Sequence, residues 1–152
     1  MKKFTFTLIF MFIAVMVFPQ KKYQYKVITS VESIVPMGMG RSRIIETKDE
    51  VNSADFTTER TNGKKSKQKG VKRANAKVNN FAETKLLNFY SGVGINFQNI
   101  ASNDALITST INKVIDEGWE LAFVASGVES DAGKDDGRGI FITRYIFRKA
   151  VK

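Results

Sequence analysis

The chain of 152 residues contains no cysteine and no histidine, and it has only two prolines. Without cysteine the chain has no disulfide, no thiolate metal site and no cysteine nucleophile. Without histidine it has no imidazole metal ligand and lacks the commonest general base. Only Asp, Glu, Lys, Ser, Thr and Tyr remain for catalysis. We therefore expect no cofactor, and the composition favours a protein that is not an enzyme.

The first twenty residues have the pattern of a secretory signal peptide. Lys2 and Lys3 form a positively charged start, and a largely apolar run follows from Phe4 to Phe18. An uncleaved membrane anchor is the alternative, but the run is shorter than the roughly 18 apolar residues of a spanning helix. We predict that residues 1–20 are removed on export, which leaves no stable membrane span. Residues 21–152 would then be a single periplasmic or secreted domain, because about 100 to 200 residues make one domain.

The formal net charge of +9 is concentrated in the leader and in one internal segment. Eight basic residues and no acidic residue lie between Arg60 and Lys77, and the rest of the chain is close to neutral. Clustered cations bind anionic partners, here an envelope protein or a polyanion. Nucleic acid is disfavoured because no aromatic residue in the segment can stack on bases. The alternative is a solvated charge run without a partner. The candidate binding residues are Lys64, Lys65, Lys67, Lys69, Lys72, Arg73 and Lys77.

Two strands are predicted before this basic segment. Residues 23–34 alternate between one set with Tyr23, Tyr25 and Val27 and a more polar set, which is typical of a half-buried strand. A turn at 36–40 then leads to a second strand over 41–48. Residues 49–81 have few large apolar side chains and are predicted to be a flexible basic insertion. Apolar residues return over 81–100, where the type of element stays open.

A helix is predicted from about Asn103 to Glu117. Ser102 or Asn103 is its expected N-cap, and Gly118 ends it because glycine adopts the left-handed conformation easily. A strand should follow at once, with Trp119, Leu121, Phe123 and Ala125 on one face. We expect Trp119 to anchor the helix on the sheet. After a loop over 128–139, residues 140–149 form the last strand.

These elements define an α+β fold, a mostly antiparallel sheet of about four strands with one main helix packed on one face, in the order ββ-loop-αββ. The run Glu117-Gly118-Trp119-Glu120-Leu121, with the opening strand Tyr23 to Val27, resembles a small bacterial domain of unknown function. That domain opens with a Tyr-x-Tyr-Lys-Val strand and has a Glu-Gly-Trp-Glu-Leu junction between helix and strand. The resemblance implies the same fold and no activity, and it omits the basic insertion.

Acidic residues in the last hairpin form a weak calcium candidate. Carboxylates are the ligands that calcium prefers, but their spacing does not match an EF-hand loop, and a polar hairpin tip is the favoured interpretation. The residues are Glu129, Asp131, Asp135 and Asp136.

The sequence therefore favours a non-catalytic interaction or structural module of the cell envelope. A small hydrolase or ligand-binding enzyme built on carboxylates and hydroxyls is the alternative, and a closed concave pocket would favour it. A third hypothesis is that the edge of the sheet recruits a strand of another protein, of which a long unprotected edge would be the sign.

Overall fold

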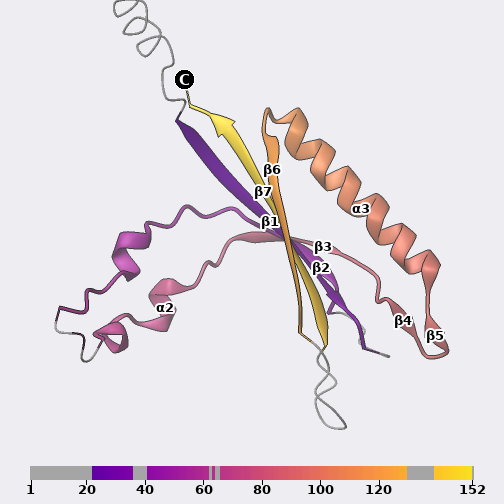
Figure 1. Ribbon diagram of the computed structural model, residues 1–152, viewed down its shortest axis with the longest axis horizontal. Helices are drawn as coiled ribbons and strands as arrows, with labels where there is room; N and C mark the ends of the chain where they lie inside the picture. Colours follow the sequence, from indigo (N-terminus) through magenta and orange to yellow (C-terminus); the bar gives the residue numbers. More distant parts are fainter. Residues whose placement is uncertain (1–21, 36–40, 62, 64–65, 130–138, 152) are drawn as a thin grey trace, which may run out of the picture.

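The computed structural model of the chain describes residues 22–35, 41–61, 63, 66–129 and 139–151 (Figure 1). The predicted signal peptide and the turn at 36–40 lie outside the described residues. Among the described helices, none is long and apolar enough to cross a membrane.

Five strands form one antiparallel sheet, with α3 (Phe97–Asp116) lying against one of its faces (Figure 1). The spatial order is β3-β2-β1-β7-β6. A two-residue pair, β4 (Tyr90–Ser91) and β5 (Gly94–Ile95), precedes the helix. The predicted α+β architecture is confirmed, with a fifth strand from the segment whose type was open. The five strands are β1 (Tyr23–Ser33), β2 (Arg43–Thr47), β3 (Phe81–Lys85), β6 (Glu120–Glu129) and β7 (Ile140–Ala150).

The core lies between α3 and the inner face of the sheet. Strand β1 pairs along its whole length with β7, from Tyr23 opposite Ala150 to Ser33 opposite Ile140. Its even-numbered side chains face the helix, so Ile28 is buried, whereas Tyr25 is 59 % exposed on the other face. The alternation was predicted, but the more apolar set of side chains is the one that points away from the core. The buried apolar residues that form the core cluster are Ile28, Ile44, Leu86, Val114 and Phe147.

Strand β6 carries a β-bulge that changes which side chains share a face. Leu121 lies opposite Phe147, but Phe123 lies opposite Ile146, so Ala122 is an extra residue on β6. Leu121 therefore packs against the core, whereas Phe123 points to the opposite face. The prediction of one shared face for both residues is wrong, because an extra residue shifts the two-residue period. β6 also continues to Glu129, past the predicted start of the loop.

Helix α3 starts earlier than predicted. Its N-cap is Asn96, whose side-chain oxygen accepts a hydrogen bond from the backbone N–H of Asn99 at 3.1 Å. The prediction of Ser102 or Asn103 as the cap is wrong, since Asn103 lies inside the helix and is fully buried. Asn103 instead forms hydrogen bonds with Leu87 and Glu32, which are distant in the chain.

The end of α3 follows the prediction. Gly118 has a φ of +85°, and its N–H donates to the carbonyl of Ile115 at 2.8 Å. The N–H of Trp119 donates to the carbonyl of Val114 at 3.3 Å, which completes a Schellman motif. The chain thus leaves the helix and enters β6 within three residues.

Residues 49–80, here called the basic arm, connect β2 to β3 through three short helical turns. These are η1 (Ser53–Phe56), η2 (Gln68–Gly70) and α2 (Arg73–Ala76). At the base of the arm, the carboxylate of Asp49 accepts a hydrogen bond from the backbone N–H of Asn80 at 3.1 Å. Further along the arm, the side-chain amide of Gln68 donates a hydrogen bond to the hydroxyl of Thr58 at 2.9 Å. In Figure 1 the arm extends on the side of the sheet opposite α3. None of its described residues is buried.

Candidate interaction surface

The space between α3 and the sheet is filled. The cavity there has a volume of about 10 Å³ and is lined by Ile28, Ile44, Ile107, Thr110, Ile111, Tyr145 and Phe147. Ligand pockets in proteins usually enclose about 300 to 1,000 Å³. This part of the described structure therefore holds no bound molecule larger than water.

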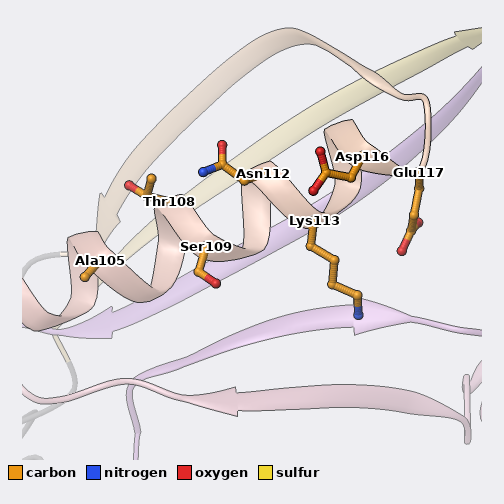
Figure 2. Close-up of a pocket in the computed structure, with 7 residues that line it drawn as sticks. All are labelled: Ala105, Thr108, Ser109, Asn112, Lys113, Asp116 and Glu117. Atoms are coloured by element: carbon orange, nitrogen blue, oxygen red, sulfur yellow. The ribbon is translucent and has the colours of Figure 1, made fainter.

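A hollow in the described surface lies along α3 and has a volume of about 830 Å³. All seven lining residues belong to α3 or to its C-cap, and Figure 2 shows their side chains leaving this one helix in different directions. A catalytic site needs polar groups that converge from several elements on one reacting atom. The hydroxyls of Thr108 and Ser109 and the carboxylate of Asp116 do not converge in this way.

A buried polar cluster around Asn103 joins the helix to the sheet. Its amide nitrogen donates to the carbonyl of Leu87 at 2.8 Å and to the carboxylate of Glu32 at 2.9 Å, and its amide oxygen accepts from the N–H of Leu87 at 2.7 Å. One side chain thereby fixes α3, β1 and the segment after β3. The sequence showed no sign of this cluster, because its members are far apart in the chain.

Burial raises the pKa of Glu32 above its ordinary value. The hydrogen bond from Asn103 lowers this pKa and the negative charge of Asp104 raises it, but burial is the largest effect. Tyr145 lies on the same face of the sheet, and burial together with the charge of Glu32 raises its pKa as well. A raised pKa in a carboxyl group is one sign of a general acid. Since Glu32 is only 6 % exposed, however, a substrate cannot reach it, and we assign the cluster a structural role.

A second cluster holds the C-terminal end of α3. The ammonium nitrogen of Lys26 lies 3.2 Å from the carboxylates of both Glu46 and Glu117, and 5.4 Å from the centre of the Trp119 ring. Burial opposes the charged form of Lys26, but the hydrogen bonds to the two carboxylates outweigh it and raise the pKa. Trp119 packs against the core, so its predicted role as an anchor is confirmed.

The face of the sheet opposite α3, here called the open face, carries most of the exposed apolar side chains of the strands. Aromatic residues stand out on it, since Tyr25, Phe81 and Phe123 are each 46 % exposed or more. Isolated exposed apolar residues are normal, whereas large contiguous apolar patches are typical of interaction surfaces. The apolar side chains of the open face come from all five strands. Its apolar members are Tyr23, Tyr25, Val27, Val31, Ile45, Phe81, Phe123, Ile140, Ile142 and Ile146.

Ion pairs lie at both sides of the open face. Arg148 donates to both carboxylate oxygens of Glu120, at 3.0 and 2.9 Å, and Arg43 pairs with Glu83 at 2.6 Å. Arg144 lies between these pairs, beside Thr29 and Ala125 in the register, and is exposed. Its guanidinium gives the otherwise apolar centre a positive charge.

The predicted anion-binding residues are spread over the basic arm. Lys67, Lys69, Lys72, Arg73 and Lys77 are exposed, and all five lie in or next to η2 and α2. Lys64 and Lys65 lie outside the described residues. The arm and the open face lie on the same side of the sheet, opposite α3 (Figure 1).

The weak calcium candidate is largely untested. Glu129 is the exposed last residue of β6, while Asp131, Asp135 and Asp136 lie outside the described residues. Within the described ranges, no group of three or more acidic residues could hold a metal ion.

Comparison of the chain with protein-family models, with curated proteins and with solved structures gives no match. The resemblance to a small bacterial domain of unknown function therefore stays a prediction.

Proposed function

We propose that this protein is a non-catalytic interaction module of the cell envelope, and that it binds an acidic protein partner with its open face and basic arm. One observation carries the proposal. The apolar open face and the basic arm lie on the same side of the sheet, opposite α3 (Figure 1).

The size of the open face supports a protein partner. Strands rise about 3.3 Å per residue and lie about 4.8 Å apart, so β1, β6 and β7, with 10 or 11 residues each, and the two five-residue strands cover about 650 Å². Each partner in a standard protein interface buries about 800 Å². The open face with part of the arm reaches this size, which is far larger than a small ligand needs.

The charge of the same side supports an acidic partner. Arg144 would be buried beneath a docked protein, and a buried charge without a counter-ion is costly. Carboxylates on the partner would pair with Arg144 and with the exposed cations of the arm, and such complementarity increases association rates and selects the partner.

The enzyme alternative lacks a comparable observation. The interior between helix and sheet is filled, and the buried carboxyl group of Glu32 is closed to substrate. The envelope location rests on the signal-peptide pattern of residues 1–20 and is part of the proposal.

Photocrosslinking in the producing cell tests the proposal. A photoreactive amino acid at Tyr25, on the open face, should give a protein adduct, whereas the same amino acid at Ala105, on the exposed side of α3, should give none. Equal adducts at both positions, or none at either, would refute the open face as the binding surface. An adduct that resists protease digestion would identify a polyanion as the partner and would refute the acidic protein.

The contribution of the arm is tested with a charge-neutralised variant. Replacing Lys67, Lys69, Lys72, Arg73 and Lys77 by Gln should abolish the adduct at Tyr25, because exposed charges attract an acidic partner across about 8 Å at physiological salt. Lys113→Gln on α3 is the matched control and should leave the adduct intact. Deletion of residues 60–77 should abolish the adduct as well while the melting temperature hardly changes, since no described residue of the arm is buried.

A further inference from the structure

The outer edge of β6 lacks the features that usually protect an edge strand. β6 is the last strand in the order, and within the described residues it pairs only with β7. From Leu121 to Val128 it has no charged residue and no proline. Phe123, Val124 and Val128 are exposed by 62 %, 54 % and 62 %. A long, uncharged, apolar edge readily pairs with another strand.

The opposite edge of the sheet is protected. β3 has only five residues, two of which are the charged Glu83 and Lys85, and the basic arm leads directly into it. Short length and charge are the usual means of blocking edge pairing. The contrast between β3 and β6 indicates that β6 is kept open for a partner strand.

The bulge at Ala122 limits the pairing segment to residues 123–129. Within it, Val124 and Val128 lie on the α3 side of the sheet with Ser126, whose hydroxyl lies 2.9 Å from that of Thr143. Phe123 lies on the open face. The exposed apolar residues of β6 thus lie on both faces of the strand. An added neighbouring strand would have side chains on both faces of the sheet, and these could pack against the exposed residues of β6.

We propose that β6 pairs antiparallel with β6 of a second copy of this chain, with the two-fold axis at Ser126. In this register Val124 lies opposite Val128 of the second copy, Ser126 lies opposite its own copy, and Phe123 lies opposite Glu129. The dimer joins two five-stranded sheets into one continuous sheet. The inference rests on the edge of the sheet and not on the open face, so it stands apart from the proposed function.

Self-pairing is favoured over a foreign strand by three features of this register. The two valines form a β-branched pair across the strands, which is stabilising, and no like charges lie opposite each other. One surface serves both subunits, as in most two-fold dimers. The basic arms are attached at the far edge, so four strand spacings of about 4.8 Å in each copy separate them by more than the screening length of about 8 Å.

The absence of cysteine from the chain makes a disulfide test specific. Residues opposite each other in antiparallel strands have Cα atoms about 4.5 to 5.5 Å apart, within the range of a disulfide. Ser126→Cys should therefore form a disulfide-linked dimer at least about tenfold faster than Val93→Cys under mild oxidation, because pairing raises the effective thiol concentration. Val93 is fully exposed in the turn between β4 and β5 and is the matched control. Equal rates for the two variants would overturn the proposal.

Sedimentation tests the register. The protein should be a dimer, and Val124→Lys and Val128→Glu should each weaken the dimer by about tenfold, because each places a charge opposite a valine. Mixing the two variants should restore a dimer, since the lysine of one then faces the glutamate of the other. Val93→Lys should leave the dimer intact, and circular dichroism should show all variants folded. A monomer with a dissociation constant above about 1 mM, or a dimer that neither β6 variant weakens, would overturn the proposal.

Discussion

The ammonium group of Lys149 donates a hydrogen bond to the backbone carbonyl of Glu117, with an Nζ–O distance of 2.8 Å. The last carbonyls of a helix lack partners within the helix, and here the final strand supplies one. The same ammonium lies 5.8 Å from the centre of the Trp119 ring, which Lys26 also approaches. Two lysines and one indole thus attach the end of α3 to β1 and β7.

Replacing Gly118 by Ala should destabilise the protein by about 1 kcal/mol. The φ of +85° is costly for any residue with a Cβ, and the added atom would lie 3.3 Å from the ammonium of Lys149, a flexible group that can shift. Urea unfolding monitored by circular dichroism measures the change. Gly70→Ala is the control and should be nearly neutral, because its φ is not positive and a Cβ there meets no atom within 4 Å. Equal costs for both variants would contradict the strain at Gly118.

Replacing Trp119 by Ala should cost about 3 kcal/mol, the lower end of the range for a large core aromatic, because the indole is only half-buried. The loss comprises its packing against the core and its contacts with the two ammonium groups. Trp119→Phe should cost clearly less, since a ring remains. Because Trp119 is the single tryptophan, unfolding must be followed by circular dichroism. A near-neutral Trp119→Ala would mean that the ring contributes little to holding α3.

The sequence predicted the parts of the fold that depend on neighbouring residues. The end of α3 at Gly118 and the alternation of β1 and β7 are local patterns, and the structure confirms them. The buried face of β1 was harder to predict, because its odd-numbered positions carry several large apolar side chains, whereas Ile28 is the only one at the even-numbered positions that face the core. The bulge at Ala122 depends on the pairing with β7, which a local pattern does not contain.

The candidate surfaces were predictable to different degrees. The run of basic residues in the sequence indicated the basic arm. It did not indicate that the arm lies on the same side of the sheet as the open face. The type of element that contains β3 stayed open, because its neighbours in the sheet, and not a two-residue period, stabilise this strand. Asn103 was mistaken for a helix cap, since the same side chain can accept a backbone hydrogen bond at a cap or inside a core.

Replacing Asn103 by Ala should cost about 3 kcal/mol or more, because it leaves the backbone N–H and carbonyl of Leu87 and the carboxyl group of Glu32 without their partner in the core. Asn112→Ala, on the exposed side of the same helix, is the control and should change the free energy of unfolding by less than about 0.5 kcal/mol. Chemical unfolding of both variants measures the difference. Similar costs for the two would show that the buried hydrogen bonds add no stability.

The buried carboxyl group of Glu32 should make the stability of the protein depend on pH. Burial raises its pKa above the ordinary value of 4.5, so the folded state holds this proton more tightly than the unfolded state does. The cost of ionising Glu32 is absent below pH 4.5, appears as the pH rises from there to the folded pKa, and is complete above it. Stability from this group therefore falls with rising pH within that window.

Glu32→Gln removes the titration, while its amide oxygen can still accept the hydrogen bond from Asn103. Relative to the unchanged protein, this variant should gain stability as the pH rises through the window, and the difference should be constant below and above it. Urea unfolding at a series of pH values measures the difference, with Glu59→Gln on the exposed arm as the matched control. A difference that does not change with pH would show that Glu32 ionises as easily in the folded protein as in the unfolded chain.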